Sequence, residues 1–425
     1  MFHQCIERVR ARSACRINHA LPAPKKLTLD PTTNRARAAR ELRHPWIPYI
    51  SAAIFPPMKI ASTTLTGNNA EIMGDALRSV VDWVDLCLVI DTGVTDDSLK
   101  VARAIAGDKC VVRQFAWTRD FSAARNFALD AARAIGADWA VTLDTDERIQ
   151  PNGEDLRAAM RDADVDVLMM SNEGREYAKE RCFRLPARAR FRGPTHESFP
   201  SYKVGSRTLE LATFTELGKS PDALRRKFER DLEILIEHVK AHPDDPRWHY
   251  YLGESLKNLD RREEAVGAYD ACAALRGWNE ESAWACYRAA ECLSALGRHR
   301  DAIDRCAVGL TRHAGIAELP WLAAFCAYQL GDNAQAVYWA RLSITYGLFA
   351  GSGADVPRIG FRNPSALYEG PYDVLRFALK NLGDVFGAGE AERAYIQALA
   401  ARGQKAPPRS SSAGQPSTAL AGEQK

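Results

Sequence analysis

The sequence of 425 residues is 26% charged and 46% hydrophobic, which is typical of globular proteins and excludes collagen-like, fibrous and wholly disordered classes. At roughly 100–200 residues per domain, this length predicts two or three domains, each large enough to bury a core. The formal net charge of +3 predicts no nucleic-acid partner, because phosphate-driven binding needs a strongly basic surface.

Residues 1–57 are rich in Arg and Ala and show no sustained periodicity. They hold ten Lys and Arg against three Asp and Glu, a balance of +7, which leaves −4 for residues 58–425. Three interpretations are open: a disordered basic leader, a transit-like segment, or translated upstream sequence that precedes a true start at Met58. We favour the last, because a strand-like segment begins directly afterwards at Lys59.

Four short apolar segments alternate with helical patterns in the next part of the chain. The strand-like segments are 59–65, 86–90, 110–115 and 139–143, and the helical ones are about 70–82, 96–106 and 121–135. This alternation predicts an α/β domain with a mostly parallel sheet and helices on both faces. Right-handed crossovers place the C-terminal strand ends at one edge, where such sheets bind ligands.

From about Pro221 the strand pattern is replaced by a repeat of roughly 34–37 residues. Three segments align by a turn residue and by an alanine five residues later, namely Asp260 and Ala265, Gly297 and Ala302, and Gly331 and Ala336. The pattern resembles tetratricopeptide repeats, with a generic helical bundle as the alternative. We predict such repeats over 220–350, a helical segment over 351–404, and a disordered tail rich in Pro, Ser and Gly over 405–425.

The fourth strand-like segment leads into the strongest candidate site, in the sequence WAVTLDTDERI. Asp144 and Asp146 stand at spacing i, i+2 just past the strand and can converge through a turn on one divalent cation. Mg²⁺ or Mn²⁺ prefers oxygen ligands and leaves room for phosphate oxygens. A solvated surface turn is the alternative, but the position at the strand end favours metal and diphosphate binding.

An acidic residue also follows the second strand-like segment. Asp91, in VIDTGVTDDS, can accept hydrogen bonds from a base or a ribose, and the alternative is that it only orders the turn. The sequence contains neither GxGxxG nor GxxxxGK[ST], so we expect neither a dinucleotide site nor a P-loop.

Three motifs in order, VIDTGVTDDS, WTRDFSAARNFAL and WAVTLDTDERI, resemble family 2 glycosyltransferases of the Rossmann-like GT-A fold. They are most similar to the branch that joins this domain to tetratricopeptide repeats and includes bacteriocin-peptide S-glycosyltransferases. The resemblance covers about residues 59–219 and extends through the repeats to about 345. It implies a GT-A domain over 58–219, a nucleotide diphosphate sugar as donor, and Mn²⁺ or Mg²⁺ as cofactor.

The resemblance also implies roles for residues that would bind the donor. Thr64 opens a segment that resembles the nucleotide-base loop of the family, and Asp91 matches the aspartate that contacts uracil or ribose. Asp144 and Asp146 match the metal and ribose ligands.

A second donor-binding group lies in the motif DFSAARN. Arg125 and Asn126 stand early on a helix, where they would steady the donor phosphates or the acidic turn. The alternative for Arg125 is a structural ion pair with Asp120 or Asp144.

The segment RFRGPTHESF resembles the short His-Glu motif of the family. Inverting transfer needs a base that takes the acceptor's proton, and a carboxylate is the usual choice, so we assign Glu197 as the base and His196 as an orienting or metal-site partner. A structural pair is the alternative. Relatives often carry a metal-binding His near the end of the domain, where this sequence has Glu216; we expect Glu216 to be a third oxygen ligand.

We therefore predict an inverting, metal-dependent glycosyltransferase that moves a sugar from a nucleotide diphosphate sugar to a peptide, protein or glycan acceptor. The repeats would recognise the acceptor or form a homodimer. The alternative, motivated by Glu216, is a repeat-based adaptor with a degenerate, non-catalytic GT-A domain. A nucleotidyltransferase is disfavoured, because no Gly- and Lys-rich loop follows the first strand.

The cysteines and the apolar runs bear on the compartment. The ten cysteines include no CxxC pair and no matching His spacing, so we expect neither a disulfide framework nor a zinc site. No apolar run approaches the roughly 18–20 residues of a membrane span, and no secretion signal follows the basic start. We expect a cytoplasmic protein without a membrane span.

Overall fold

The computed structural model describes residues 57–151, 156–173, 177–348, 361–403 and 416, and residues 57–425 form one of its two compact units. The expectations for residues 1–57 and 405–425 therefore fall almost wholly outside the described residues.

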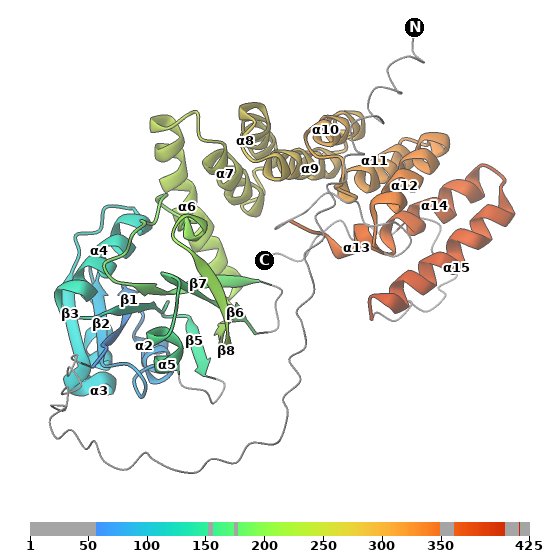
Figure 1. Cartoon of the computed structure of the whole chain (residues 1–425). Helices are drawn as coiled ribbons and strands as arrows, with labels where there is room; N and C mark the ends of the chain where they lie inside the picture. Colours follow the sequence, from blue (N-terminus) through green and yellow to red (C-terminus); the bar gives the residue numbers. More distant parts are fainter. Residues whose placement is uncertain (1–56, 152–155, 174–176, 349–360, 404–415, 417–425) are drawn as a thin grey trace, which may run out of the picture. The chain divides into compact units, whose positions relative to one another are not determined.

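The first half of the described chain forms an eight-stranded sheet with helices on both sides (Figure 1). Its strands are β1 (Ile60–Thr66), β2 (Leu86–Asp91), β3 (Cys110–Gln114), β4 (Trp139–Thr142), β5 (Glu147–Pro151), β6 (Val167–Asn172), β7 (Ala178–Arg184) and β8 (Ser206–Glu216). Its helices are α2 (Ala70–Arg78), α3 (Ser98–Ala106), α4 (Phe121–Ala134) and α5 (Leu156–Arg161), with short 3₁₀ turns at Gly107–Lys109 and Ser201–Lys203.

The strand order is β3-β2-β1-β4-β7-β6-β8-β5. The four predicted strand segments form the parallel half, in which β1 pairs with β2 and β4, and β2 pairs with β3. β7 then runs antiparallel to β4 and to β6, β6 pairs in parallel with β8, and β5 runs antiparallel to β8. This is the predicted α/β fold class, and it brings the ends of β1, β2 and β4 to one edge of the sheet.

Alternation along the strands divides the core between the two faces of the sheet. Ile60 and Val89 belong to one apolar cluster with α2, α3 and α5, while their neighbours Ala61 and Ile90 belong to a second cluster with α4. A period of two is what a strand buried on both faces requires. The sheet is therefore a rigid support for the loops at its edge.

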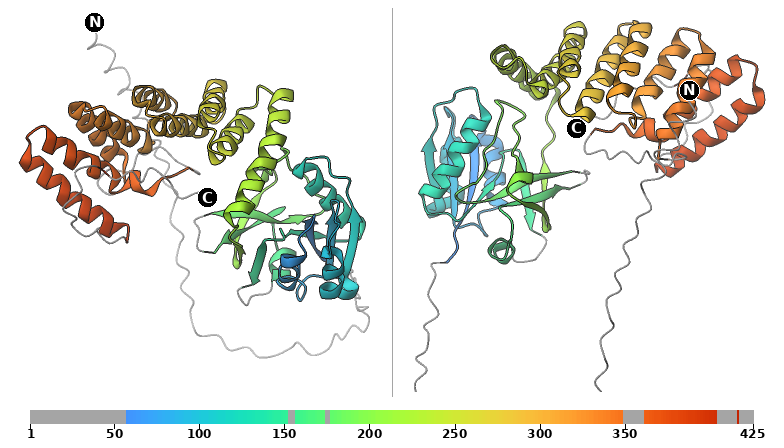
Figure 2. Two further views of the ribbon diagram at one scale, coloured as in Figure 1. Left: turned by 180° about the vertical axis from the view of Figure 1, so that it is seen from behind. Right: turned by 45° about the horizontal axis from the view of Figure 1, so that its top comes forward.

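The second half is all helical. Its helices are α6 (Pro221–Ala241), α7 (Pro246–Asn258), α8 (Arg262–Leu275), α9 (Asn279–Ala295), α10 (His299–Arg312), α11 (Glu318–Gln329), α12 (Asn333–Tyr346), α13 (Pro364–Leu367), α14 (Gly370–Asn381) and α15 (Val385–Ala401). Successive antiparallel pairs lie side by side in both views of Figure 2, as in tetratricopeptide repeats.

The aligned turn and alanine positions explain the pairing of these helices. Asp260, Gly297 and Gly331 all have positive φ, at 62°, 75° and 77°, and each separates the two helices of a pair. The alanines at 265, 302 and 336 are fully buried. Gly253 allows a close approach within one pair, because a Cβ there would lie 2.6 Å from the ring of Tyr269 on the paired helix.

A fourth pair of the same design follows, within the region for which the sequence predicts only a helical segment. Gly383 turns between α14 and α15 with a φ of 82°, and Ala388 stands five residues later and packs against the repeat core. The same spacing could have identified this pair from the sequence.

Among the described residues, no helix is long and apolar enough to cross a membrane. The eight described cysteines are all free, and all except Cys110 are buried.

Candidate functional site

A cavity of about 1270 Å³ opens at the edge where the parallel strands end. One wall comes from the end of β1 and the segments after β1, β2 and β4, including Thr66, Thr92 and the acidic turn. The opposite wall comes from the loop over residues 191–199 and from α6 and α7. The helices after the sheet domain are therefore part of the cavity.

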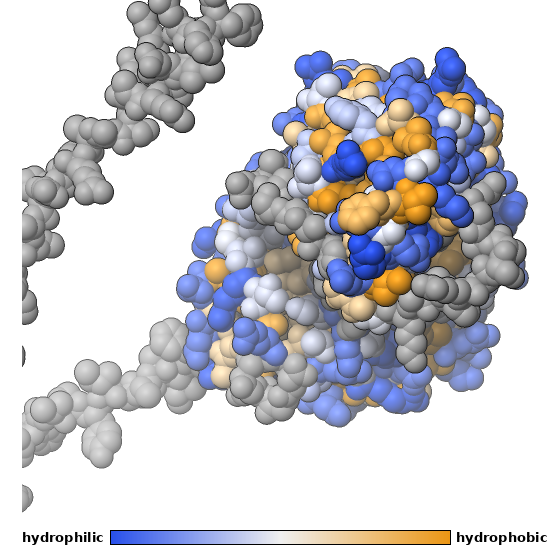
Figure 3. Space-filling view, turned by 90° about the vertical axis from the view of Figure 1, so that its right-hand side faces the viewer, coloured by the Kyte–Doolittle hydropathy of each residue, from blue (hydrophilic) through white to orange (hydrophobic). Residues whose placement is uncertain are grey.

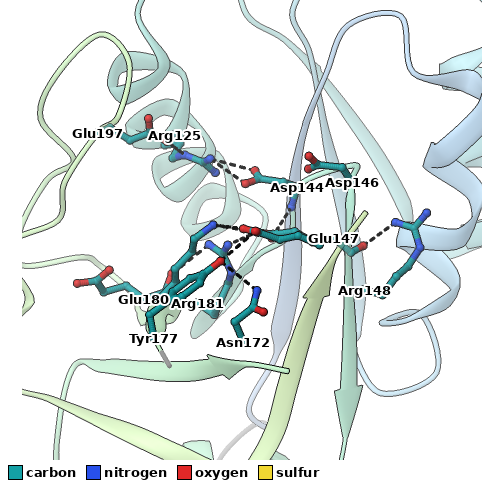
Figure 4. A network of polar contacts seen from close by, with 12 residues as sticks. Arg125, Asp144, Asp146, Glu147, Arg148, Asn172, Tyr177, Glu180, Arg181 and Glu197 are labelled. Atoms are coloured by element: carbon teal, nitrogen blue, oxygen red, sulfur yellow. Dashed lines mark hydrogen bonds and ion pairs between the residues drawn. The ribbon is translucent and has the colours of Figure 1, made fainter. Parts of the chain in front are cut away.

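The acidic turn presents both of its predicted carboxylates to this cavity. Asp144 and Asp146 both line it, and each pairs with a cation of the chain. Lys219, just before α6, donates to Asp146 through Nζ, while Arg125 donates to both oxygens of Asp144 at 2.9 and 3.2 Å. Two negative and two positive side chains thus meet at the end of β4 (Figure 4 shows Asp144, Asp146 and Arg125).

Arg125 is aimed at the turn by the start of α4. The carboxylate of Asp120 caps this helix by accepting from Ala123 N at 2.9 Å, and the Arg125 guanidinium projects from the next turn between Asp144 and Glu197. Burial alone would raise the pKa of Asp144, but Arg125 and other cations outweigh it and lower that pKa to about 2. Both Asp144 and Arg125 are therefore charged at neutral pH.

Glu147 and Arg181 support the acidic turn from the protein interior, and the sequence analysis predicted neither as a site residue. The amide of Asp144 donates to Glu147 Oε2 at 3.1 Å, and Arg181 on β7 donates to the other oxygen. Both side chains are almost completely buried. Burial and the nearby charge of Asp144 raise the pKa of Glu147, and the positive charge of Arg181 opposes this rise. A Glu directly after the DTD sequence was the available signal.

Glu216 lies at the end of β8, beside the acidic turn, and is engaged by neighbouring side chains. It pairs with Glu147 in the register between β8 and β5, accepts from Tyr177 Oη at 2.9 Å, and forms an ion pair with Lys179. It does not line the cavity, whereas Lys179 does. The role of Glu216 as a third metal ligand stays a prediction, because its ion pair with Lys179 resembles the ion pairs that Asp144 and Asp146 make with Arg125 and Lys219.

Two further predicted residues, Thr64 and Asn126, do not line the cavity. Thr64 is fully buried within β1, and the chain reaches the cavity at Leu65 and Thr66 instead. Asn126 exchanges hydrogen bonds with the backbone of Phe191, at 2.9 and 3.0 Å. Asn126 therefore fixes the backbone of the 191–199 loop, and neither side chain lines the cavity.

Asp91 orders the turn after β2, which is the alternative that the sequence analysis left open for it. Its Oδ1 accepts from the amides of Gly93 and Val94 at 2.9 and 2.8 Å, and the side chain does not line the cavity. The neighbouring Thr92 does line it, so the turn that Asp91 fixes is part of the cavity wall.

His196 and Glu197 both line the cavity but face different partners. Glu197 accepts from Arg125 Nε, which places its carboxylate near the acidic turn (Figure 4). The ring of His196 stacks on Tyr251 of α7, with centroids 4.1 Å apart and planes 7° apart. The structure thus brings Glu197, Arg125, Asp144 and Asp146 together and turns His196 away from them.

A basic wall from α6 completes the cavity, and the sequence reasoning did not identify it. The cations of this wall are Arg226, Lys227 and Arg230 on α6, followed by Arg247 on α7. Their positions recur at the three- and four-residue spacing of one helical face, which is the signal that was available. Such a wall favours anionic groups within the cavity.

The comparisons with known proteins agree with this arrangement. Residues 64–219 match the sequence model of the family described as glycosyl transferase family 2. The SPbeta prophage-derived glycosyltransferase SunS of Bacillus subtilis (strain 168) is 24% identical over 215 residues, which are 47% of this chain and 49% of SunS. A TPR repeat-containing protein of Synechococcus elongatus is 32% identical over 205 residues, 44% of this chain and 49% of that protein. The chain thus spans about half the length of these curated relatives.

Solved structures similar to this chain include two of MamA. A crystal structure of MamA shares 14% sequence identity over 44% of this chain and 98% of MamA, with a TM-score of 0.35. MamA from Desulfovibrio magneticus RS-1 shares 17% over 43% of this chain and 91% of that chain, with a TM-score of 0.33. The family match and the two curated relatives agree with the fold: residues 64–219 are similar to glycosyl transferase family 2, and the chain continues into helix pairs similar to tetratricopeptide repeats.

Proposed function

We propose that this protein transfers a sugar from a nucleotide diphosphate sugar to a peptide, protein or glycan acceptor, with inversion at the anomeric carbon. The observation that carries the proposal is the meeting of Asp144, Asp146, Arg125 and Glu197 at the strand ends, within one cavity. A diphosphate and a reacting carbon need such a combination of cations and a carboxylate.

Each residue has a role in that reaction. Glu197 takes the proton of the acceptor's nucleophilic atom as that atom bonds to the anomeric carbon. The bond from that carbon to the diphosphate oxygen breaks, and the nucleoside diphosphate leaves with the electron pair. Arg125 orients Glu197 through its ion pair, and Arg125 and Lys219 supply positive charge beside the departing phosphates. Thr66 and Gly67 form part of the wall available to the nucleotide.

We further propose Mn²⁺ or Mg²⁺ as cofactor, held by Asp144 and Asp146. Their hard oxygen atoms suit either ion, and both line the cavity, which Glu216 does not. Among the residues that the structure describes, no group of three or more His, Cys, Asp or Glu could hold a metal by itself, so diphosphate oxygens would complete the coordination. When bound, the ion would neutralise charge on the leaving diphosphate.

We propose that the repeats serve acceptor recognition or homodimer formation. The last helix pair supports the dimer, because Val385 and Phe386 at the start of α15 are 78% and 75% exposed. Figure 3, which views the molecule from its right-hand side in Figure 1, shows orange apolar residues gathered among hydrophilic ones on that side. Exposed apolar patches commonly mark protein contacts.

We also propose a cytoplasmic location, because buried free thiols fit a reducing compartment.

The test is donor turnover. The full chain is incubated with Mn²⁺ and each of UDP-glucose, UDP-galactose, UDP-N-acetylglucosamine and GDP-mannose, and released nucleoside diphosphate is measured. We expect one donor to be hydrolysed, and Asp146→Asn to lower its turnover by at least about a hundredfold, a loss typical of removing one charge-stabilising group. Asp108→Asn, at an exposed turn outside the cavity, is the matched control.

Two outcomes would contradict the proposal. Turnover that is unchanged in Asp146→Asn would separate the activity from this cavity. A thermal shift with nucleoside diphosphates but no consumption of any donor would favour the adaptor, in which the domain only binds nucleotide. Ligand at 100 times its dissociation constant should stabilise the fold by about 2.7 kcal/mol, so binding would be detected.

A further inference from the structure

The loop over residues 191–199, which carries His196 and Glu197, packs directly on the first helices of the repeat domain. Gly193 has a φ of 99°, and a Cβ at this position would lie 2.0 Å from Cη2 of Trp248 on α7. The loop backbone therefore lies against the indole ring with no room for a side chain. Arg247, the preceding residue on α7, donates to the carbonyl oxygen of His196 at 3.3 Å.

The His196 side chain is held on two further sides. Its ring stacks on the ring of Tyr251, and its Nε2 lies 3.6 Å from Oδ2 of Asp231 on α6. Its backbone has a φ of 49°, a left-handed conformation that a residue with a side chain adopts at an energetic cost. Contacts on three sides of one residue fix this conformation.

Asp231 is the centre of these contacts. Its side chain is 0% exposed and accepts from Lys227 at 2.7 Å and from Arg230 at 2.8 Å, besides its contact with His196. Burial alone would raise the pKa of Asp231, but the contacts with His196, Lys227 and Arg230 keep that pKa well below its usual range. A buried carboxylate costs free energy unless it is paired, and here all three partners line the cavity.

Glu197 is thus positioned from two domains. Arg125 of the sheet domain holds its carboxylate, while Asp231 and Tyr251 of the helical domain hold the residue directly before it. Asp231, Arg247 and Tyr251 all lie beyond residues 64–219, the part that matches the glycosyltransferase family. Their contribution is therefore visible only in the three-dimensional contacts.

We propose that Asp231 and Tyr251 are positioning residues of the transfer site, which act through His196 to hold Glu197 against the reacting atoms. The inference rests on the proposed function, because it assigns the second domain a part in that reaction. The first two helices of the repeat domain then complete the active site, besides any contact with the acceptor. An orientation error of about 1 Å at a reacting group can cost about a hundredfold in rate, so loosening this loop lowers kcat.

The experiment compares Asp231→Asn and Tyr251→Leu with the wild-type chain. The donor is whichever nucleotide sugar the wild type hydrolyses fastest in the presence of Mn²⁺. We expect kcat to fall by about tenfold to a hundredfold in both variants. KM for the donor should stay within about twofold in Tyr251→Leu, because this change leaves the strand-end wall and the cations of α6 untouched. Tyr251→Phe keeps the stacked ring and should recover most of the kcat that Tyr251→Leu loses. Glu229→Gln, at an exposed ion pair with Arg225 on α6, is the control.

Hydrogen exchange supplies a readout that needs no turnover. The amide of Ser198 donates to Arg192 O at 3.0 Å, so exchange in a peptide spanning 191–199 reports whether the loop stays closed. We expect faster exchange there in Asp231→Asn and Tyr251→Leu, with exchange of β1 and β4 unchanged.

The outcomes separate this inference from the proposed function. If the wild type turns over no donor, the proposed function fails and this inference fails with it. If the wild type is active but both variants keep its kcat, or if the loop exchanges as in the wild type, only the positioning role is refuted. A fall in kcat that Tyr251→Phe does not recover would also refute the role of the stacked ring.

Discussion

Replacing Arg181 by Met should destabilise the sheet domain strongly, because it leaves a buried carboxylate without its main partner. Arg181 and Glu147 are only 5% and 2% exposed in their side chains. Removing one partner of a buried ion pair typically costs about 3–5 kcal/mol. Glu147 keeps the amide of Asp144 and has Lys179 at 3.6 Å, so we expect the lower end, about 3 kcal/mol. At about 2–4 °C per kcal/mol for a domain of this size, the unfolding midpoint should fall by about 6–12 °C.

Urea and thermal unfolding followed by circular dichroism would measure this loss. Arg188→Met is the matched control, since Arg188 is 75% exposed and its ion pair with Asp166 should contribute no more than about 1 kcal/mol. Adding Glu147→Gln to Arg181→Met removes the stranded charge but keeps an acceptor for the Asp144 amide, and should recover at least half of the loss. The reasoning is refuted if Arg181→Met stays within about 1 kcal/mol of the wild type, or if the double variant is no more stable than the single one.

Two further predictions concern packing and pH. Gly253→Ala should lower the free energy of unfolding by about 1–3 kcal/mol, because its Cβ would lie 2.6 Å from the Tyr269 ring. Gly267→Ala, with nothing within 4 Å of the added Cβ, should raise the free energy of unfolding by about 0.5–1 kcal/mol in the same urea experiment. Equal effects at both positions would contradict the close-approach argument. The low pKa of Asp144, about 2, means that its ion pair stabilises the fold above the unfolded-state pKa of about 3.9, and that this contribution, about 2 kcal/mol, is lost as pH falls towards 2. The stability difference between wild type and Asp144→Asn should therefore shrink between pH 5 and pH 2, and a constant difference would contradict the assignment.

What the sequence predicts well here is local in the chain. Asp144 and Asp146 follow a four-residue apolar strand, so their place at the sheet edge is fixed by the strand itself, and both line the cavity. The spacing of the turn glycines at 297 and 331 likewise predicts the helix pairs from nearby residues alone.

What the sequence does not predict depends on contacts between distant segments. The partner of Glu216 in its ion pair is Lys179 on β7, 37 residues away along the chain, and the sequence around Glu216 does not predict this contact. The contacts of His196 with Asp231 and Tyr251 join a loop of one domain to two helices of the next. Thr64 shows a finer limit, because a difference of one residue along β1 decides whether a side chain is enclosed in the sheet or lines the cavity.

The docking of the 191–199 loop on α7 also determines where this protein can be cut and rejoined. A chimera joined at residue 219, where the family match ends, would exchange Trp248 and Tyr251 for foreign side chains and leave Gly193 and His196 facing the wrong surface. A junction after α8 would keep both helices that contact the loop and the Gly253–Tyr269 contact between α7 and α8. For grafting new repeat arrays onto this sheet domain, the natural unit therefore extends to the end of α8.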